Sequence, residues 1–436
     1  MCCSLEDGKG IDLPSRLRLI GFTLFSAIYF LSFFHDMAVP VVGDDLVSDL
    51  SLDASALGFM SSGFFVLYAL TQPAIGLLSD RIGPERASAG ALLIGALGSF
   101  LAVQADGFTF AFLGRIMMGT GLAAGFIPGM KLIAVMFRRK VFTTYNALFA
   151  GIGNLSCLVG TVPLTRLAAT MEWRQVFAGL GVVSVLLAGS SWAFARMRSA
   201  HTMSATGPER EVVSWVSLLD VLRNRPLWFL GFFLFMKYGS QAAFQGLWGI
   251  PCLSSVYQVD SSSAARAVTM IATGYVLGAP VMGWLADTMA ARGMDLFVAR
   301  MSVLTKTTIC YVLTWTPIVL APGLLPFPAM YVLLFIMGIC ASSSSLVFAV
   351  AKDLFPSKVS GFVFGLVSLM YILGGAMVPP VVGWFTRLLA AQGLQGGVLY
   401  SKALIPCLVV AALALAFESM AKEANAKPFG ASEHAE

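Results

Sequence analysis

Long apolar stretches separated by short polar segments dominate the pattern along this chain. A stretch of about 17 to 25 apolar residues is long enough to cross a bilayer as a helix. Helix is the expected form, because backbone groups in lipid must be hydrogen-bonded within the segment and the stretches lack the alternating pattern of a membrane barrel. Twelve spans are predicted, at residues 19–42, 57–79, 87–104, 108–130, 143–167, 175–196, 226–249, 264–286, 300–321, 328–350, 359–387 and 400–420.

The composition agrees with a membrane protein. Of the 436 residues, 58% are hydrophobic and 12% are charged, whereas about a quarter of the residues of a soluble domain are charged. The predicted fold class is therefore all-α, a polytopic membrane protein with twelve transmembrane helices. The chain contains no Gly-x-x-x-x-Gly-Lys-Ser/Thr loop, so ATP-driven pumping by this chain alone is not expected. We expect no cofactor.

The longest polar interruption separates the sixth and seventh spans and predicts a linker between two halves. The halves share a repeat, because PAIGLLSD at 73–80 and PVMGWLAD at 280–287 carry Pro, Gly, Leu and Asp at the same spacing, 207 residues apart. Such a repeat predicts a six-plus-six duplication in parallel orientation. The predicted parts are a cytoplasmic tail at 1–18, a six-helix bundle at 19–196, a cytoplasmic linker at 197–225, a second six-helix bundle at 226–420 and a cytoplasmic tail at 421–436.

The distribution of lysine and arginine predicts the orientation in the membrane. With the N-terminus inside, the inner stretches carry twenty of these residues and the outer stretches carry five. This bias satisfies the positive-inside rule with both termini in the cytoplasm. The net charge of +5 therefore reflects topology, and we expect no nucleic-acid partner. We expect a monomer surrounded by lipid in a cell membrane, either a plasma membrane or a bacterial inner membrane.

The N-terminus and the cysteines suggest no further chemistry. Residues 1–18 lack an apolar core, so no signal peptide is expected. The seven cysteines show neither metal-site nor disulfide spacing. Cys2 and Cys3 are expected to be free thiols, with acylation in a eukaryotic host as the alternative. An enzyme is not expected either, because the chain shows no Ser/His/Asp set, no facing pair of carboxylates and no metal-ligand cluster.

Three sequence motifs resemble those of the major facilitator superfamily. The loop GLLSDRIGPER at 76–86 resembles the superfamily's signature loop between helices two and three, and Asp287 closes its usual degenerate copy between helices eight and nine. The run RIMMGTGLAAG at 115–125 is similar to the helix-four motif, and EWRQVF at 172–177 to an element before helix six. The resemblance covers essentially the whole chain and implies a transporter with two pseudo-symmetric bundles that works by alternating access.

The signature loop has an implied mechanical role. Gly76 allows close approach of helices, and Asp80 can oppose the positive N-terminus of another helix. The resemblance implies a latch that stabilises the outward-facing state, and the alternative is a simple topological anchor. The latch residues are expected to be Gly76, Asp80, Arg81, Gly83, Arg86 and Asp287.

Asp36 and Arg115 are ionisable residues inside predicted spans, where a charge costs at least about 2.5 to 3.5 kcal/mol. Each lies six or seven residues from the outer end of its span, so both are expected roughly 10 Å below the outer surface. We hypothesise an ion pair that opens and closes with protonation of Asp36 or with substrate binding. The alternative is a permanent structural pair.

Helix seven carries a polar stripe at helical spacing, formed by Lys237, Gln241, Gln245 and Trp248. Facing lipid would be costly, so the stripe is expected to line water or substrate. Alternatively, Lys237 pairs with a carboxylate of another helix, although no second buried carboxylate besides Asp36 is evident. Two buried cations against one acid favour an anionic substrate. If Arg115 is fully occupied by Asp36, this argument depends on Lys237 alone.

Several other polar side chains are weaker candidates, because each can bind a carboxylate or simply bridge two helices. Lys131 and Lys306 lie near cytoplasmic ends and are expected to extend toward the interface. The remaining substrate-binding candidates are Tyr68, Asn154, Tyr275 and Tyr371.

The sequence favours one function over its alternatives. We expect a secondary active transporter that takes up a small organic anion, such as a carboxylate, by symport with protons. The alternatives are an efflux antiporter for amphipathic or drug-like compounds and a transporter-like receptor that moves no substrate. Helix five lacks the Gly-Pro pair common in antiporters, having GIGNLSC at 151–157 instead, which argues against the antiporter.

Overall fold

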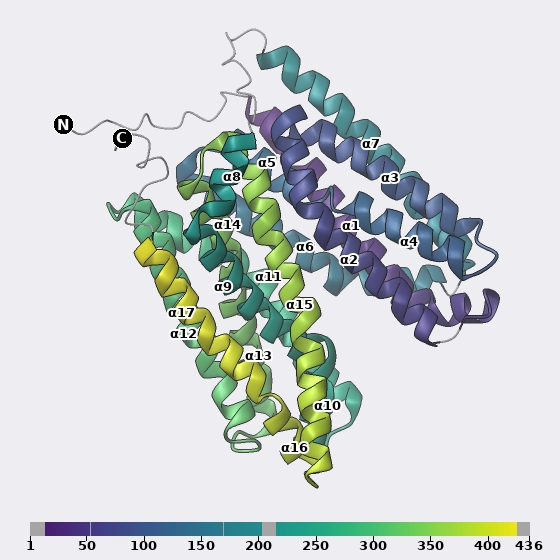
Figure 1. Cartoon of the computed structure of the whole chain (residues 1–436), viewed down its shortest axis with the longest axis vertical. Coiled ribbons are helices and arrows are strands. Elements are labelled where there is room, and N and C mark those ends of the chain that lie inside the picture. Colours follow the sequence, from purple (N-terminus) through teal and green to yellow (C-terminus); the bar gives the residue numbers. More distant parts are fainter. Residues whose placement is uncertain (1–13, 53, 169, 203–214, 425–436) are drawn as a thin grey trace. The chain divides into compact units, whose positions relative to one another are not determined.

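A computed structural model describes residues 14–52, 54–168, 170–202 and 215–424 (Figure 1). Most of the predicted N-terminal tail with Cys2 and Cys3, the middle of the predicted linker and most of the predicted C-terminal tail lie outside the described residues. The described part is built from helices and contains no strand. The all-α expectation is confirmed. Nine helical stretches of the described part are long and apolar enough to cross a membrane.

Each predicted span coincides with a helix or with a run of helices. Four spans are interrupted, because a helix ends within the span and another begins a few residues later. The helices are α1(Ser15–Asp49), α2(Ala54–Ile82), α3(Pro84–Val103), α4(Phe108–Leu122), α5(Phe126–Met136), α6(Arg139–Ala168), α7(Trp173–Thr202), α8(Trp215–Arg223), α9(Arg225–Ala243), η1(Phe244–Trp248), α10(Gly249–Tyr257), α11(Ser261–Ala291), α12(Leu296–Val319), α13(Phe327–Ser342), η2(Ser343–Ser345), α14(Leu346–Leu354), η3(Ser357–Val359), α15(Ser360–Ala391), α16(Gly396–Ala403) and α17(Ile405–Ala424).

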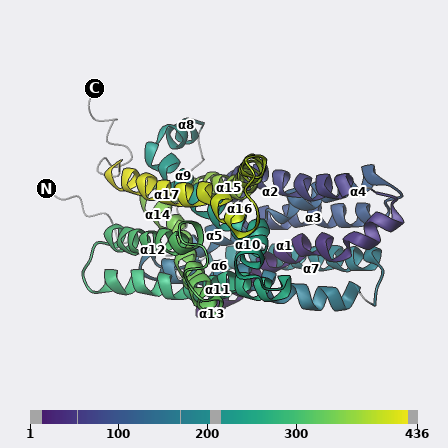
Figure 2. The ribbon, with the colours of Figure 1, turned by 90° about the horizontal axis from the view of Figure 1, so that it is seen from below.

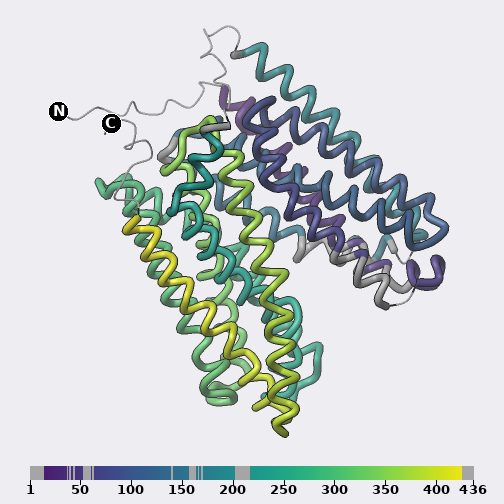
Figure 3. Tube along the Cα trace, in the orientation of Figure 1, coloured from purple at the N-terminus to yellow at the C-terminus, as the bar shows by residue number. Residues whose placement is uncertain are grey.

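Two compact units divide the chain. Unit 1 comprises residues 1–142, 152–218 and 356–365, and unit 2 comprises residues 143–151, 219–355 and 366–436. Three helices contribute to both units: residues 143–151 of α6 belong to unit 2, α8 is divided after Leu218, and residues 360–365 of α15 belong to unit 1. Figure 3 shows the Cα trace coloured by residue number. The domain boundaries drawn from the sequence stay a prediction.

In unit 1, α3 lies beside α4 and α7, as Figures 1 and 2 both show. Glycines on the facing surfaces allow this close packing. A Cβ atom at Gly121 would lie 2.1 Å from the backbone nitrogen of Gly95, so no larger residue fits there. In lipid, where no hydrophobic force drives helices together, such close backbone contact is a main source of helix association. In unit 2, Gly274 of α11 and Gly338 of α13 allow the same close packing of helices.

The interruption between α4 and α5 is stabilised by serines of neighbouring helices. The hydroxyl of Ser32 on α1 donates to the carbonyl of Leu122 over 2.9 Å, and the hydroxyl of Ser88 on α3 donates to the carbonyl of Ala124 over 3.2 Å. A helix end buried in lipid needs such partners for its free backbone groups. A Cβ atom at Gly125 would lie 2.5 Å from the Ser32 hydroxyl, which explains a glycine at this position.

The structure buries more charges than the sequence analysis expected. Lys131 does not extend toward an interface, because its ammonium group lies 2.8 Å from the Asp80 carboxylate inside unit 1. In unit 2, Arg300 is buried and pairs with Asp353. Both cations lie within a few turns of a helix end. Other helices of the protein cover these helix ends and supply ion-pair partners. The two charges therefore stay inside the protein.

Candidate functional site

Arg115 projects from α4 into the interior of unit 1, where its side chain is 2% exposed. Its guanidinium lies 3.9 Å from the Asp36 carboxylate of α1 and donates one hydrogen bond to the carbonyl of His35 over 3.1 Å. The same group lies 4.1 Å over the ring of Phe64. The structure thus brings the two predicted ionisable residues together. The pair is a loose one, at the upper limit of ion-pair distance.

The guanidinium of Arg115 keeps unused hydrogen-bonding capacity. Arginine has five N–H donors in a planar fork that matches a carboxylate, yet the Arg115 Nε has no hydrogen-bond partner among the described residues. A buried donor without a partner costs about 1 to 3 kcal/mol. An incoming carboxylate could accept a hydrogen bond from this donor.

A stripe on α2 extends this polar cluster. Phe64, Tyr68 and Gln72 follow each other at one-turn spacing, so they lie on one face of the helix. The rings of Phe64 and Tyr68 are stacked, with centroids 6.0 Å apart. Gln72 is 0% exposed, and neither atom of its amide has a hydrogen-bond partner in the described part of the chain. Tyr68 therefore lies in a polar cluster that also includes Gln72.

Lys237 occupies the interior of unit 2 and is 0% exposed. Its ammonium group donates to the hydroxyl of Ser343 over 2.8 Å and to that of Thr308 over 3.1 Å. Lys237 is therefore not open to water in this structure, and its role in lining a substrate site stays a prediction. The side chain points at the hydroxyls of α12 and η2, because these are the groups that can stabilise a buried cation there.

The expectation of a single intramembrane acid is wrong. Glu418 on α17 is 2% exposed, and it interacts electrostatically with Lys237. Glu418 lies at the last turn of the predicted span 400–420, where an acid is usually counted with the aqueous segment, so the apolar pattern does not reveal its burial. In the described part of the chain no ion pair within 4 Å joins Lys237 to Glu418, and the hydrogen bonds of Lys237 go to hydroxyls, so the alternative in which Lys237 pairs with a carboxylate of another helix stays a prediction.

The rest of the helix-seven stripe is interrupted by a π-helix. Gln241 donates to the side-chain carbonyl of Gln245 over 3.1 Å, and the indole of Trp248 donates to the carbonyl of Pro379 over 3.2 Å. The π-helix η1 begins at Phe244 and adds a residue to the turn, so the residues after it leave the face predicted for a regular helix. π-bulges of this kind are frequent at functional sites.

Aromatic candidates of unit 2 gather on neighbouring helices. The ring of Tyr371 on α15 is stacked on that of Tyr238 on α9, with centroids 3.8 Å apart, and both are half-buried. Tyr275 on α11 is buried. Asn154 is half-buried on the part of α6 that belongs to unit 1. The sequence analysis did not single out Tyr238, although it lies beside Lys237 in the chain.

The signature loop makes a defined contact inside unit 1. The carboxylate of Asp80 accepts hydrogen bonds from the backbone amides of Gly361 and Phe362, each over 2.9 Å. These amides are the second and third residues of α15, so the negative charge lies at a helix N-terminus, where it is favoured. Lys131 holds the same carboxylate from the other side. A Cβ atom at Gly76 would lie 2.1 Å from the Gly361 carbonyl oxygen, so this contact requires glycine.

The degenerate copy of the loop makes an equivalent contact inside unit 2. The Asp287 carboxylate of α11 accepts from the backbone amide of Thr144 over 2.9 Å and from its hydroxyl over 2.7 Å. Thr144 lies near the start of α6. The internal repeat is therefore also a repeat of contacts, in which an aspartate at the end of one helix binds the beginning of another.

Comparison with known proteins decides the family. A family model described as Major Facilitator Superfamily matches residues 24–248. The chain belongs to the major facilitator superfamily. It is a multi-pass secondary transporter and not an enzyme, since its relatives are transporters.

The relatives of this superfamily member are distant. The chain is 24% identical over 298 residues to a Bacillus subtilis (strain 168) protein named "Uncharacterized transporter YybO". The matched region covers 65% of this chain and 68% of that protein. It is 24% identical over 301 residues to an Escherichia coli (strain K12) protein named "Probable L-galactonate transporter", covering 65% of each. A Corynebacterium glutamicum gentisate transporter is 22% identical over 344 residues, 78% of this chain and 74% of that one.

Solved structures show the same superfamily fold. The transporter FucP in its outward conformation has a TM-score of 0.64 with 16% sequence identity, covering 93% of this chain and 99% of that one. At this level of identity the likeness concerns the fold alone. The predicted major facilitator fold is confirmed.

Other residues of the signature loop shape its surroundings. Gly83 precedes α3 with a φ of 94°, a backbone conformation that favours glycine. The next residues start α3, where the carboxylate of Glu85 pairs with Arg198 of α7. Arg86 is half-buried and Arg81 is exposed. The loop is thus fixed to α7 as well as to α15.

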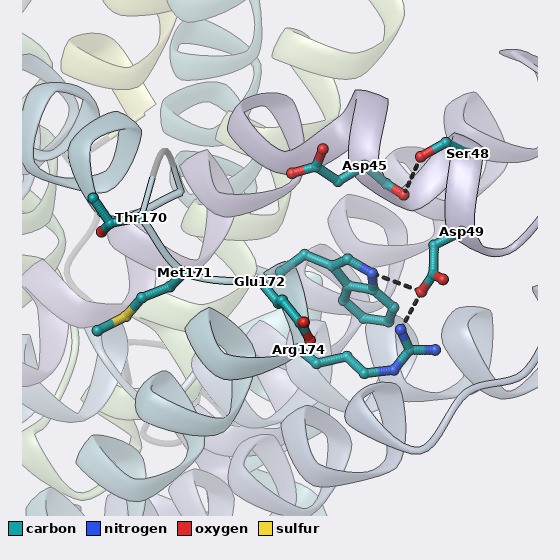
Figure 4. A pocket seen from close by; sticks show the side chains of 8 residues that line it. Asp45, Ser48, Asp49, Thr170, Met171, Glu172 and Arg174 are labelled. Atoms are coloured by element: carbon teal, nitrogen blue, oxygen red, sulfur yellow. Dashed lines mark hydrogen bonds and ion pairs between the residues drawn. The ribbon is translucent and has the colours of Figure 1, made fainter.

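A polar pocket of about 460 Å³ lies elsewhere in unit 1, at one end of α1 and α7 (Figure 4). None of the predicted site residues lines it; its lining residues are Asp45, Ser48, Asp49, Thr170, Met171, Glu172, Trp173 and Arg174.

The Trp-Arg element beside this pocket has a structural role. Arg174 pairs with Asp49 and donates to the carbonyls of Val103 and Ala105, and the indole of Trp173 donates to Asp49 over 3.0 Å. Figure 4 shows Asp49 and Arg174 facing each other. One side chain of α7 thereby connects the end of α1 with the segment between α3 and α4.

This connection predicts a pH dependence of stability. Hydrogen bonds from Arg174 and Trp173 hold the pKa of the Asp49 carboxyl below its ordinary value. A carboxyl whose pKa is lowered by folding stabilises the folded state at pH values above its unfolded-state pKa. This stabilisation is lost as the pH falls through the folded-state pKa. Thermal unfolding of the detergent-solubilised protein should therefore lose stability in the acid range, and Asp49→Asn should flatten that part of the profile. Identical acid profiles for both proteins would contradict the role of Asp49.

Proposed function

We propose that this transporter takes up a small organic anion with a carboxylate group, by alternating access and in symport with protons. The observation that carries the proposal is the Arg115 guanidinium, a buried cation with a loose partner at 3.9 Å and an unused donor. A cation in this state favours an anionic ligand, because pairing removes the cost of a buried unsatisfied charge.

The neighbours of Arg115 suggest what the rest of the substrate looks like. Tyr68 and Gln72 can bind hydroxyl or carbonyl groups, and the Phe64 ring offers an apolar face. The named substrates of the relatives, L-galactonate, galactarate, D-glucarate and gentisate, are all carboxylates that also carry hydroxyl groups. We therefore propose a hydroxylated carboxylate, either a sugar acid or a hydroxylated aromatic acid, as the substrate class.

Unit 2 contributes further proposed substrate-binding residues. Gln241 and Gln245 are hydrogen-bonded to each other. A ligand that binds one of these amides would replace this hydrogen bond with another, at little cost in free energy. Tyr275 and Tyr371 can stack on a ring or donate to a carboxylate. Lys237 is proposed to add positive potential, since direct contact would require it to leave Ser343 and Thr308. Asn154 stays a prediction.

Thermal stabilisation by ligands tests this proposal. A ligand that binds only the folded state stabilises it by about 2.7 kcal/mol at 100 times its Kd. The purified protein should therefore unfold at a higher temperature with galactonate, glucarate or gentisate, and not with the corresponding uncharged amides. The screen at pH 5.5 and 7.5 also reports proton linkage. Stabilisation by the amides alone, or by lipophilic cations, would favour an exporter of drug-like compounds instead.

Asp36 is the proposed proton-coupling residue of unit 1. Proton binding to Asp36 would free Arg115 from its only carboxylate neighbour within 4 Å in the described part of the chain, so protonation and anion binding would favour each other. Asp36→Asn should abolish pH-driven uptake and spare substrate exchange, measured in proteoliposomes with and without a pH gradient. Full pH-driven uptake by this variant would remove Asp36 from the coupling role.

The signature loop is proposed to act as a latch of the outward-facing state. The contacts of Asp80 with the start of α15 and of Asp287 with the start of α6 support this role, and Gly76 is required for the close approach. Arg81, Gly83 and Arg86 are proposed to hold the loop in place. We further propose that the signature loop and both termini face the cytoplasm of a cell whose plasma or inner membrane contains the protein as a monomer.

A further inference from the structure

Glu418 is a buried acid in the second half of α17, in unit 2. One carboxylate oxygen accepts a hydrogen bond from the hydroxyl of Thr305 on α12. The other oxygen has no hydrogen-bond partner among the described residues. An ionised carboxylate can accept about four hydrogen bonds, so the groups around Glu418 satisfy an ionised form poorly.

Charged and titratable groups of several helices surround Glu418 and its neighbour Lys237. α17 packs against α9, α12 and α16. Lys237 of α9 and Lys422 of α17 itself act on Glu418 electrostatically. Tyr311 of α12 lies under the Lys237 ammonium, at 5.8 Å from ring centroid to nitrogen. Cys340 of α13 also acts on Lys237.

Lys237 and Glu418 are joined through hydroxyl groups on one face of α12. Lys237 donates to Thr308, and Thr305, one turn earlier on the same helix, donates to Glu418. No ion pair within 4 Å joins the two charges in the described part of the chain. Hydroxyls alone stabilise this buried cation and this buried acid. Gain or loss of one proton therefore changes the local balance of charge strongly.

We propose that Glu418 is a second proton-binding site of the transport cycle, and that its charge controls how firmly Lys237 is held by Thr308 and Ser343. This inference rests on the proposed proton symport. The proton comes from water and forms an O–H bond with the carboxylate oxygen that lacks a partner, and the same bond breaks when the proton is released on the other side. With Glu418 neutral, Lys237 is left as an uncompensated cation that attracts the substrate anion.

Glu418 and Asp36 have corresponding surroundings in the two units. Asp36 lies beside Arg115 in unit 1, and Glu418 lies beside Lys237 in unit 2. In both cases an acid lies near a buried cation without a close ion pair. Two acids that each bind a proton predict that more than one proton accompanies each substrate anion.

The number of protons moved per substrate tests this proposal. Proteoliposomes with a set pH gradient and membrane potential are used to find the potential at which net flux of a carboxylate substrate is zero. Glu418→Gln is expected to lower the stoichiometry by about one proton and to keep substrate exchange. The matched control is Glu423→Gln, an exposed acid of the same helix, which should leave it unchanged. An unchanged stoichiometry in Glu418→Gln would overturn the proposal.

Infrared difference spectroscopy of the purified protein makes the test independent of transport. A pH change should produce a carbonyl band of a protonated carboxylic acid, and Glu418→Gln should remove one component of it. Glu418→Asp keeps a titratable acid and serves if the glutamine variant does not fold, since it should shift that component rather than remove it. If the carbonyl band is the same in all variants, the proposal is overturned, whether or not a carboxylate is transported. Loss of the component without any transport would sink the proposed function alone.

Discussion

Replacing Arg115 with glutamine is expected to lower carboxylate uptake by at least about 100-fold. Two charge-assisted hydrogen bonds between a guanidinium and a carboxylate contribute about 3 to 6 kcal/mol, at about 1.5 to 3 kcal/mol each, and about 1.4 kcal/mol corresponds to a tenfold change in affinity. Uptake by Arg115→Lys should fall almost as far, because lysine lacks the planar guanidinium that binds a carboxylate with two hydrogen bonds. Initial uptake rates and ligand-induced thermal shifts measure the effect.

A structural role for Arg115 would produce a different pattern. The single variant also leaves Asp36 without its cation, which is destabilising by itself. The double variant Arg115→Gln, Asp36→Asn removes both charges and should recover thermal stability without recovering uptake. Arg166→Gln removes an exposed arginine of the same unit and serves as the matched control. Uptake that returns in the double variant would show that Arg115 only stabilises the bundle.

Replacing Asp80 with asparagine is expected to shift the conformational equilibrium toward the inward-facing state by about 10- to 100-fold. The carboxylate accepts from two backbone amides and pairs with Lys131. Asparagine has one acceptor oxygen and no charge, so at least one charge-assisted contact, worth about 1.5 to 3 kcal/mol, is lost. Gly76→Ala should act in the same direction, because its Cβ atom cannot fit 2.1 Å from the Gly361 carbonyl oxygen.

Accessibility labelling of single cysteines at the two ends of the protein measures this shift. Labelling should decrease on the outer side and increase on the cytoplasmic side in Asp80→Asn. Asp106→Asn removes an exposed aspartate of the same unit and should change nothing. An unchanged labelling distribution in both Asp80→Asn and Gly76→Ala would leave the loop as a topological anchor without a latch function.

The helices of this protein could be predicted from the sequence, because the apolar run that lipid requires is visible residue by residue. The interruptions could not. The break before Phe126 depends on hydroxyls of Ser32 and Ser88, which are far away in the sequence. The π-helix at Phe244 changes the register of a stripe that a regular period of 3.6 residues places on one face. Both features depend on tertiary partners that hydropathy does not reveal.

The candidate site residues show the same division between what the sequence reveals and what it does not. Asp36 and Arg115 could be paired from depth alone, because each lies well inside its span. Glu418 and Lys131 could not, since both lie near the ends of spans, where the boundary between water and protein depends on what packs against the helix end. The orientation of Lys237 needed the structure as well, because a stripe on a helix does not say whether it faces another helix or a cavity.

The central claim is that this superfamily member accumulates a carboxylate at the expense of a proton gradient. The most direct measurement is uptake of labelled galactonate, glucarate and gentisate into proteoliposomes that are acidic outside. We predict that at least one of them accumulates above its external concentration, that a proton carrier abolishes the accumulation, and that Arg115→Gln shows none. Uptake of all three that only equilibrates across the membrane, or that is equal in wild type and Arg115→Gln, would contradict the claim.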